Sequence, residues 1–490
     1  MLSKSKYMVG LGCPRLLWCI FNSPEKVPPI DEGTQALFDQ GHEVGNLAKN
    51  KFPLGVEVRF SREAVETTIE LLKRKVPVFE GSFAYKNSYC KADILEPVGE
   101  EWDLIEVKQS TSVKDEHLLD VAFQRYCIEG SGLKIRKCQI MHINNKYIKK
   151  GGIDPLGFFN CVDVTDQVAS LIGDVEVHIQ EMLRVIGLKE MPTPELGVEC
   201  ADPGNCPVCC NRLPVDCVTE LYHLGKKAFP LINQGILLIK DVDLRMLNEK
   251  QKIQRECLLD GNPHIEREKI RKFLDSFSYP LFLLDFETVA PAIPLFDGMG
   301  PFQQLSFQVS IHVIENGPCN NKAKETVKHI EYLAPDSNDP RPGLISTLRK
   351  IGSTGSLVAF NCSFEKARIK ELAEAFPEET WLLGLNERMV DLLDIFRNFW
   401  FYHPGQHGSC SIKKVLPALT GQGYEGLEIG KGEQAAREFL EVTYKGNPHG
   451  KDIPKIKEAL LKYCERDTEG MVDILQVLWG ICGMKKHENF

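Results

Sequence analysis

The residues from Pro280 to Val289 read PLFLLDFETV and decide the fold of the C-terminal part of the chain. An apolar run ends in Asp285 and Glu287, which are two residues apart, so in a strand both side chains project from the same face. Buried like charges this close are unfavourable without a cation, and carboxylates are ligands that suit Mg²⁺ and Mn²⁺. The pattern predicts a buried strand that ends at a divalent cation, although a solvated strand end would have the same sequence.

Two further motifs place acids on later elements. SLVAFNCSFEKARIKEL (356–372) predicts a strand that leads through Asn361 into a helix with Glu365 in its first turn, where an acid also suits the helix dipole. LKYCERDTEGMVDIL (461–475) places Tyr463 and Asp467 four residues apart, on one face of a helix. Either acid could instead be an ordinary solvated or capping residue of its helix.

In this order the motifs resemble those of the DnaQ-like DEDDy 3'-5' exonucleases, which have the ribonuclease H fold. The resemblance implies that Asp285, Glu287, Glu365 and Asp467 hold two Mg²⁺ or Mn²⁺ ions about 4 Å apart, which clamp the attacking and leaving oxygens of phosphodiester hydrolysis. It also implies that Tyr463 orients the attacking water. One departure is Glu365, which is one methylene longer than the Asp of the family.

The stretches between these motifs offer further candidates. Asp391 in MVDLLDIF is either an accessory metal ligand or an acid at the start of a helix. HPGQHGSCSIKKVLPAL (403–419) is either an ordinary helix start or a grip for a phosphate backbone, with backbone donors near Gly408 and Ser409 and the charges of Lys413 and Lys414.

A second set of ionisable residues lies in the N-terminal part. KADILEP and LIEVKQS predict two strands that carry Asp93, Glu106 and Lys108, and the last two share a face. With Gln124 on the following helix, the set resembles the PD-(D/E)XK nucleases, closest to the RecB-like branch. The resemblance implies a restriction-endonuclease-like core in which Asp93 and Glu106 bind metal, Lys108 polarises water or phosphate, and Gln124 positions the lysine or the substrate.

This second resemblance has departures that leave two outcomes open, cleavage or DNA binding with reduced or lost cleavage. Gly45 stands where RecB-like enzymes often have a metal-binding histidine, and His42 is out of register. The helix motif, from Gln124 to Tyr126, is shorter than the usual spacing, and Glu80 could assist from the preceding strand.

The chain has 17 cysteines, a high count for a cytosolic protein, in which disulfides are rare. A subset of RecB-like nucleases holds a 4Fe-4S cluster with one cysteine near the N-terminus and three after the nuclease core, and this chain has that distribution. The resemblance implies a cluster, with Zn²⁺ less favoured, and leaves open which of two adjacent cysteines is a ligand. The candidate ligands are Cys13, Cys200, Cys206, Cys209 and Cys210. Cys217 is a reserve candidate, and the remaining cysteines are interpreted as small buried hydrophobes.

Hydrophobic periodicity predicts the order α-β-β-β-α-β before residue 150. After residue 280 it predicts the strands PLFLLDFE, QLSFQVSIHVI, HIEYLA and SLVAFN and the helices 364–375, 456–463 and 467–478. A Cys-, Pro- and Gly-rich stretch at 191–214 indicates a domain edge. We therefore expect an α/β chain with a nuclease-like domain at 1–215, a linker at 216–275 that is either plainly helical or a helix-hairpin-helix element, and an exonuclease-like domain at 276–490.

Length and charge set the remaining expectations. A chain of 490 residues with net charge −9 has no overall basic field, so nucleic acid would be bound by local patches. The start, MLSKSKYMVGLGCPRLLWCIF, fits neither a signal peptide nor a spanning helix, which predicts a cytoplasmic protein without a membrane partner.

The whole chain resembles a prokaryotic family of largely unknown function that fuses an iron-sulfur RecB-like domain to a DnaQ-like domain. The resemblance implies a metal-dependent nuclease that acts on DNA rather than RNA by 3'-5' exonucleolytic hydrolysis, with a second potential nuclease centre at the N-terminus. The alternatives are a nucleic-acid-binding scaffold with a degenerate N-terminal site and an RNA-processing exonuclease.

Overall fold

A computed structural model describes residues 1–193, 208, 213–317 and 327–484, which form two compact units. Unit 1 comprises Met1–Leu213 together with Pro291–Gln303, and unit 2 comprises Pro214–Ala290 together with Gln304–Phe490. The residues expected to form a linker, 216–275, therefore belong to unit 2. Cys200, Cys206, Cys209 and Cys210 lie outside the described residues.

Unit 1 is built on a seven-stranded mixed sheet with the order β2-β3-β4-β5-β6-β7, to which β1 adds by pairing with β4. The pairs β3/β4 and β4/β5 are antiparallel, whereas β5/β6 is parallel. The elements of this unit are β1 (Leu2–Ser3), α1 (Lys4–Gly12), α2 (Pro14–Asn22), α3 (Glu32–Lys49), β2 (Val56–Glu57), α4 (Ala64–Lys73), β3 (Val78–Tyr85), β4 (Ser88–Val98), β5 (Glu101–Lys108), α5 (Asp115–Gly130), β6 (Ile135–Ile143), α6 (Pro155–Phe158), β7 (Phe159–Asp163) and α7 (Thr165–Ile186).

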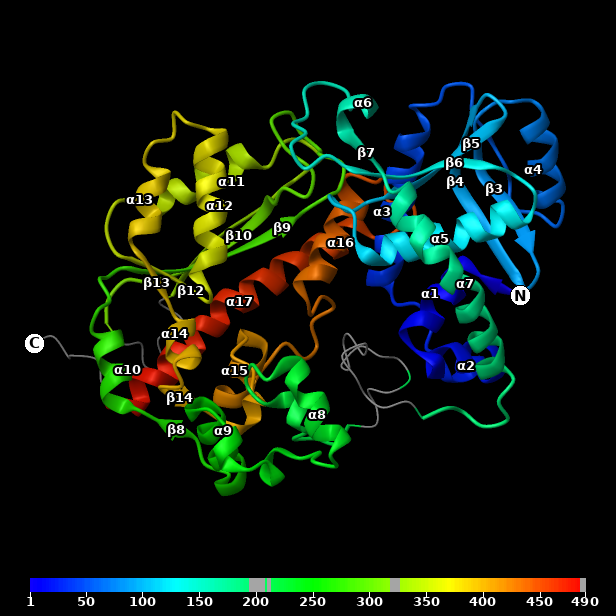
Figure 1. The fold of residues 1–490 in the computed structure, drawn as a ribbon. Helices are drawn as coiled ribbons and strands as arrows, with labels where there is room; N and C mark the ends of the chain where they lie inside the picture. The colour runs from blue at the N-terminus through cyan, green and yellow to red at the C-terminus, as the bar shows by residue number, and fades with distance from the viewer. Residues whose placement is uncertain (194–207, 209–212, 318–326, 485–490) are drawn as a thin grey trace, which may run out of the picture. The chain divides into compact units, whose positions relative to one another are not determined.

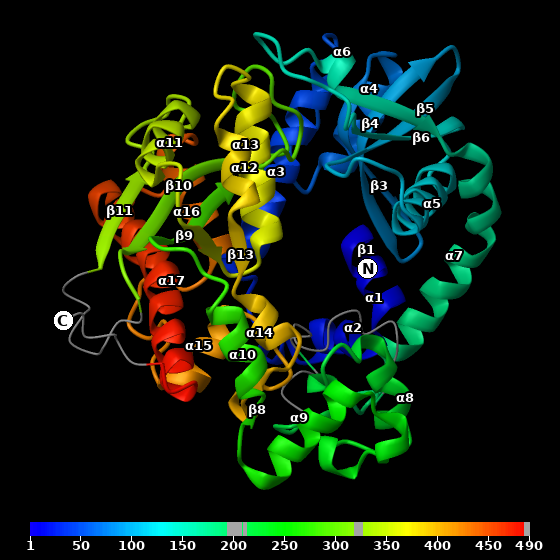
Figure 2. The same ribbon diagram turned by 90° about the vertical axis from the view of Figure 1, so that its left-hand side faces the viewer.

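Side chains alternate between the two faces of each strand in unit 1, so the sheet contributes to two hydrophobic cores. On β5, Leu104 packs into a core with α1, α4, α5 and α7, whereas Ile105 packs into a core with α3 and α6. Figure 2 shows α5 and α7 beside the strands of this sheet. Glu106 follows at the next position on the side of Leu104 and therefore faces α5, because side chains alternate along a strand.

Unit 2 contains a five-stranded sheet with the order β11-β10-β9-β12-β13. Strand β9 pairs antiparallel with β10 and parallel with β12, so it lies at the centre. The elements are α8 (Ala228–Asn233), α9 (Glu249–Asp260), β8 (His264–Ile265), α10 (Arg267–Leu274), β9 (Leu281–Val289), β10 (Leu305–Ile314), β11 (Lys328–Leu333), α11 (Arg341–Leu348), β12 (Ser356–Ala359), α12 (Cys362–Ala375), α13 (Leu382–Glu387), β13 (Met389–Asp391), α14 (Leu393–Arg397), β14 (Phe401–Tyr402), α15 (Ile412–Thr420), α16 (Gly432–Thr443) and α17 (Ile453–Ile481).

Helices cover both faces of this second sheet. Phe282, Leu284 and Phe286 of β9 pack against α11, α12 and α13, whereas Leu281 and Leu283 pack on the side of α10, α14, α15 and α17. In Figure 1, α17 crosses the strands on one side and α11 to α13 lie on the other. Every residue of β10 is buried because the strand has neighbours on both edges and both faces.

The expected α-β-β-β-α-β order is confirmed from Ala64 to Ile143 by α4, β3, β4, β5, α5 and β6, although β1, α1, α2 and β2 precede it without having been expected, and the chain is α/β. One expectation for the second part is wrong, and of the two alternatives for residues 216–275 the structure favours the plainly helical one. The helices expected at 456–463 and 467–478 are one continuous helix, α17, because the residues between them have neither Pro nor a capping Gly. Residues 218–241, all described, form one α-helix of 6 residues flanked by short 3₁₀ turns rather than a helix-hairpin-helix element.

Among the described helices, none combines the length and the apolar composition needed to cross a bilayer.

Candidate functional site

The four acids predicted for the C-terminal part come together in unit 2. Asp285 and Glu287 lie on β9, Glu365 in the first turn of α12, and Asp467 on α17. Glu287, Glu365 and Asp467 are 8%, 2% and 7% exposed, so three of the four carboxylates are almost removed from water. The structure thus brings together residues that are up to 182 positions apart in the chain.

Burial raises the pKa of every one of these acids, and repulsion by the other acids adds to the rise for Asp285 and Glu287. Burial, then the charges of Asp467, Glu287 and Glu365, hold the pKa of Asp285 well above its usual range. Burial and the charge of Asp467 raise the pKa of Glu287 to about 8. Burial raises the pKa of Glu365 to about 8, and that of Asp467 to about 6 against a lowering hydrogen bond from Tyr424. Without a cation, the cluster resists holding its full negative charge.

Two nearby arginines lower the pKa of Glu365 and of Asp467 in part, but neither forms an ion pair with these acids among the described residues. Arg368 donates from Nε to Oε2 of Glu371 at 2.8 Å. Arg466 donates from Nη1 to Glu469 at 2.8 Å and to Asp473 at 3.0 Å. Both guanidinium groups are therefore engaged by acids outside the cluster. In addition, Oε2 of Glu365 is buried without a hydrogen-bond partner among the described residues, which is costly for a carboxylate oxygen.

Two tyrosines and a lysine border the acids. Tyr463, 3% exposed, lies one helical turn before Asp467, as the sequence predicts, and Tyr424 donates a hydrogen bond from its hydroxyl to Oδ1 of Asp467. The Nζ atom of Lys413 lies 5.1 Å from the ring centre of Tyr463 and 5.6 Å from that of Tyr424. Its positive charge lowers the pKa of both Glu287 and Asp467. No pattern in the sequence predicts Tyr424, because it lies in a loop.

Two further residues border this centre. Cys464, interpreted from the sequence as a small buried hydrophobe, places Sγ 3.8 Å from Oδ2 of Asp285. Its thiol and the carboxylates of Asp285 and Glu287 each offer one ligand atom within 4.8 Å of the others. Helix α16 begins at Gly432, where a Cβ atom would lie 3.6 Å from Oε2 of Glu287 and 3.8 Å from the hydroxyl of Tyr463. The helix start therefore lies next to the acids.

Of the two interpretations of Asp391, the structure favours an acid at a helix start. Its Oδ1 accepts hydrogen bonds from the backbone N–H of Asn361 at 2.9 Å and of Leu393 at 3.2 Å, and its other oxygen forms an ion pair with Arg397. These partners occupy the carboxylate, although its charge still contributes to the raised pKa of Glu365.

The N-terminal set also comes together, with two additional members. Nζ of Lys108 donates to Glu106 at 2.7 Å and to Asp120 at 2.6 Å. Nζ of Lys4 donates to the same Oε1 of Glu106 at 2.8 Å. Gln124 donates to Oε2 of Glu106 at 2.7 Å and to Oδ1 of Asp120 at 2.9 Å.

Asp93 lies at the edge of this network, where its Oδ2 accepts the backbone N–H of Val107 at 2.8 Å. Burial and the charge of Glu106 raise the pKa of Asp93 to about 7. Burial also opposes the ionisation of Glu106, but Lys4 and Lys108 outweigh it and hold the pKa of Glu106 well below its usual range. Lys4 and Lys108 therefore largely balance the charge of Glu106, whereas burial and the charge of Glu106 keep the pKa of Asp93 and of Asp120 raised.

The sequence missed Lys4 and Asp120. Asp120 precedes Gln124 by four residues and so shares its helical face, which was an available signal. No sequence pattern indicates Lys4, because Lys4 reaches the site only through the tertiary structure. Leu2 pairs with Ser88 of β4, and α1 then begins at Lys4.

Three secondary candidates of the N-terminal part lie outside the network. Glu80 forms ion pairs with Lys91 at 2.8 Å and Lys49 at 3.7 Å, which occupy its carboxylate. Tyr126 packs edge-on against Tyr85, with ring centres 5.3 Å apart. His42 is exposed on α3. The expectation that Glu80 assists the site is therefore wrong for this arrangement.

Residues 282–411 match a domain of unknown function, DUF2779. The match begins in β9 and includes Asp285, Glu287 and Glu365, but it ends before Tyr463 and Asp467. It covers less than half of the chain.

Three curated relatives are similar to part of this chain, and each match covers a smaller share of the relative than of this chain. The chain is 28% identical over 225 residues to an uncharacterized protein of Mycoplasma genitalium, MG366, a match that covers 42% of this chain and 32% of that protein. It is 27% identical over 205 residues to the MG366 homolog of Mycoplasma pneumoniae, with 39% and 31% covered. It is 28% identical over 208 residues to the uncharacterized protein UU173 of Ureaplasma parvum, with 39% and 30% covered. The chain thus spans about a third of the length of these relatives.

Of the five main candidate cluster ligands, the structure describes Cys13, and the reserve candidate Cys217 is buried. Cys13 caps α2, where its Sγ accepts the backbone N–H of Leu16 at 3.3 Å, and it is partly exposed. Nearby in the sequence, Arg15 is 2% exposed, and its Nε has no hydrogen-bond partner among the described residues. Val208, which stands between Cys206 and Cys209 in the sequence, packs against the cluster formed by Trp18, Cys19 and Val185.

The stretch 403–419 was expected either to grip phosphate or to start a helix. The backbone N–H of Gly408 donates to the hydroxyl of Tyr402 at 3.0 Å, and that of Ser409 donates to the carbonyl of Gln406 at 3.0 Å. The expectation that these two donors hold phosphate is therefore wrong, because both are used within the segment. The helix start is confirmed by α15, and Lys413 is directed to the carboxylates as described above.

Proposed function

We propose that the chain is a metal-dependent nuclease whose C-terminal centre hydrolyses the phosphodiester bonds of DNA from the 3' end. The observation that carries the proposal is the set of four carboxylates from three elements, each with a raised pKa, while Arg368 and Arg466 form their ion pairs with acids outside the set. Such a set is stabilised by divalent cations, which bind carboxylate oxygens strongly. Asp285, Glu287, Glu365 and Asp467 would hold the ions.

The roles of the surrounding side chains follow from their positions. Bound Mg²⁺ or Mn²⁺ would stabilise charge on the attacking and leaving oxygens of a phosphodiester. Tyr463 is one turn from Asp467 and suits the orientation of the attacking water. Lys413 supplies a positive charge next to Glu287 and Asp467, where it can contact a non-bridging phosphate oxygen. Glu365 lies in the first turn of α12, from which its carboxylate would share the ions with Asp285 and Glu287.

Cleavage of end-labelled oligonucleotides tests this proposal. Anaerobically purified full-length protein is incubated with 5'-labelled single-stranded DNA or RNA and Mn²⁺ or Mg²⁺. We expect stepwise 3'-end loss that Asp285→Asn and Asp467→Asn abolish and that Glu106→Gln spares, because Glu106 belongs to the separate N-terminal network. Degradation of RNA but not of DNA would show that RNA, not DNA, is the substrate. Equal rates for wild type and Asp285→Asn would refute the assignment of the centre.

A second function, nucleic-acid binding without cleavage at the N-terminal site, is favoured by Lys4. Its ammonium group occupies the position between Glu106 and Asp120, 2.8 Å and 3.5 Å away, where a cation would be held. Wild-type protein would then show no N-terminal cleavage, and Lys4→Met would gain Mn²⁺ binding. The measurement is Mn²⁺ binding to both proteins by isothermal titration calorimetry in the Asp285→Asn background, which removes the C-terminal contribution.

We further propose a 4Fe-4S cluster that includes Cys13, Cys200, Cys206 and one of Cys209 and Cys210, with Zn²⁺ as the less favoured occupant. Arg15, which follows Cys13 by two residues and is buried with an unpartnered Nε among the described residues, suits this assignment, because a cation can offset the negative charge of a thiolate-bound cluster. Iron and acid-labile sulfide in anaerobically purified protein would support the cluster if Cys13→Ser loses both. Zinc alone in the wild type would reverse the order of the two occupants.

A further inference from the structure

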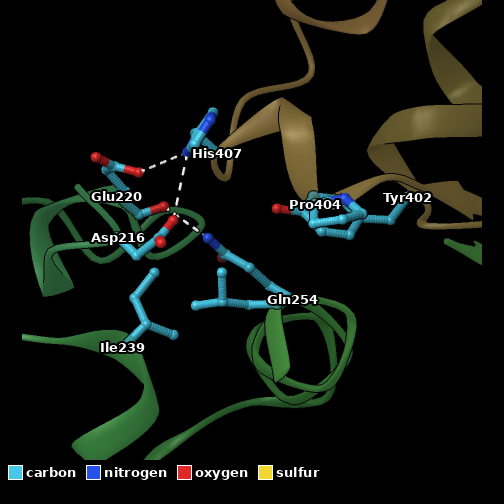
Figure 3. Close-up of a pocket in the computed structure, with 8 residues that line it drawn as sticks. Asp216, Glu220, Ile239, Gln254, Tyr402, Pro404 and His407 are labelled. Atoms are coloured by element: carbon cyan, nitrogen blue, oxygen red, sulfur yellow. Dashed lines mark hydrogen bonds and ion pairs between the residues drawn. The ribbon is translucent and has the colours of Figure 1, made fainter. Parts of the chain in front are cut away.

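Three side chains of unit 2 with potential metal-ligand atoms, none of them part of the carboxylate centre, meet at a small pocket (Figure 3). Asp216 and Glu220 come from the segment before α8, and His407 from the turn before α15. Nδ1 of His407 lies 3.1 Å from Oε2 of Glu220 and 3.5 Å from Oδ1 of Asp216. One ligand atom of each residue lies within 4.8 Å of those of the other two.

Hydrogen bonding alone does not account for this arrangement. A single N–H on Nδ1 can donate to one acceptor, and a separation of 3.5 Å is beyond a normal hydrogen bond. Asp216 therefore faces the same nitrogen without a good bond to it. Even with a protonated imidazole, the two carboxylates leave one negative charge in excess. Lys and Arg side chains form no ion pair with Asp216 or Glu220 among the described residues.

A second His–Glu pair in unit 2 shows how such a pair is balanced without a metal ion. Nδ1 of His449 lies 2.8 Å from Oε1 of Glu441, and Nζ of Lys451 lies 2.8 Å from the other oxygen of the same carboxylate. That pair has a lysine to balance its acid, which the group around His407 lacks.

The distances instead match the edges of a coordination polyhedron. With Zn²⁺ bonds of about 2.0–2.2 Å to nitrogen and carboxylate oxygen, neighbouring ligand atoms in a tetrahedron are about 3.4 Å apart. The two measured separations, 3.1 Å and 3.5 Å, lie on either side of this value. We propose that Asp216, Glu220 and His407 bind a divalent transition-metal cation, with Zn²⁺ the best match and a fourth position open to water from the pocket.

The surrounding structure holds the three ligands in place. Asp216 and His407 both have left-handed backbones, with φ of 61° and 48°, conformations that non-glycine residues keep only when their neighbours fix them. Gln254 donates from Nε2 to the carbonyl of Glu220 at 2.9 Å. A Cβ atom on Gly408 would lie 1.9 Å from the same carbonyl, so the two segments approach as closely as backbone allows. The ligands are thus preorganised for one ion.

The position of the site indicates what the ion does. It joins the segment at 216–220 to the turn at 403–408, which leads directly into α15. Because these segments are almost 190 residues apart in the sequence, a metal bridge between them restricts the unfolded chain as a long cross-link does. The ion therefore stabilises unit 2 and does not depend on the proposed nuclease activity.

Zinc stoichiometry of the full chain tests the site. The double variant Asp216→Asn, Glu220→Gln keeps side-chain size, and Asn tolerates the left-handed backbone at 216. After chelation and equilibrium dialysis against buffered Zn²⁺, we expect the double variant to bind one zinc fewer per chain than the wild type and to lose part of the zinc-induced rise in melting temperature. The matched control Glu441→Gln keeps the wild-type stoichiometry. Equal zinc content in wild type and double variant would overturn the proposal.

A measurement on the wild type covers the case in which the double variant does not fold. Crystals of the wild-type protein soaked in Zn²⁺ are measured at the zinc absorption edge. An anomalous peak between His407 and the two carboxylates supports the site. Peaks at other positions with none at His407 would refute it.

Discussion

Glu287→Gln should stabilise the metal-free protein at alkaline pH while it removes the response to divalent cations. In the folded protein, burial and the charge of Asp467 raise the pKa of Glu287 from 4.5 to about 8. Between these values the folded state binds more protons than the unfolded state, so the unfolding free energy falls as pH rises from about 4.5 to about 8. A glutamine keeps the shape of the side chain and removes this loss.

The size of the effect follows from the shift. A change from 4.5 to about 8 corresponds to an upper value of about 5 kcal/mol at 1.36 kcal/mol per pH unit. Part of the repulsion remains in the variant, because Asp285 and Asp467 still face each other. We therefore expect the variant to gain roughly 2 kcal/mol at pH 8, which is several degrees in melting temperature, and to gain nothing below pH 4.5.

The assay is thermal unfolding in EDTA at pH 5 and pH 8, repeated with Mn²⁺. Wild type should gain stability from Mn²⁺ at pH 8, because the cation replaces the protons on the carboxylates, and the variant should gain much less. Glu331→Gln is the matched control, since Glu331 is an exposed acid on β11 of the same sheet. A variant that is less stable than wild type in EDTA at both pH values would show that the four acids are not in repulsion.

Three other predictions concern single side chains. Lys4→Met should lower the unfolding free energy by about 3 kcal/mol at pH 7, because it leaves buried carboxylates short of a cation, and Mn²⁺ should restore part of the loss in a thermal melt. Tyr424→Phe removes a hydrogen bond that lowers the pKa of Asp467, so the acidic limb of the pH–rate profile should move to higher pH; an unchanged limb would contradict the role of Tyr424. Gly408→Ala should cost more than 3 kcal/mol in urea unfolding or abolish folding, because its Cβ would lie 1.9 Å from a carbonyl oxygen, whereas Gly421→Ala, with a similar φ of 71° and nothing within 4 Å, should cost only about 1 kcal/mol.

Local patterns predicted much of the fold and of the C-terminal site. The alternation of PLFLLDFETV indicates which face of β9 carries Asp285 and Glu287, and the spacing of Tyr463 and Asp467 places both on one side of a helix. These predictions succeed because strand and helix periods depend on neighbouring residues alone. The same reasoning failed at the break expected within 456–478, where no capping or breaking residue interrupts α17. It also failed for the phosphate grip, because the backbone N–H groups of Gly408 and Ser409 donate to Tyr402 and Gln406.

Only the tertiary structure decides how each acid is balanced. The D-x12-E-x-K spacing of the N-terminal motif predicts a metal site, but Lys4, 102 residues before Glu106, supplies a second ammonium group to it. Tyr424 contacts Asp467 from a loop that has no regular pattern. Asp216 contacts His407 although the two residues are far apart in the sequence. The sequence by itself determined which residues can ionise and on which face of a strand or helix they lie. Their charge depends on groups brought within a few ångströms by packing, and no local period encodes those contacts.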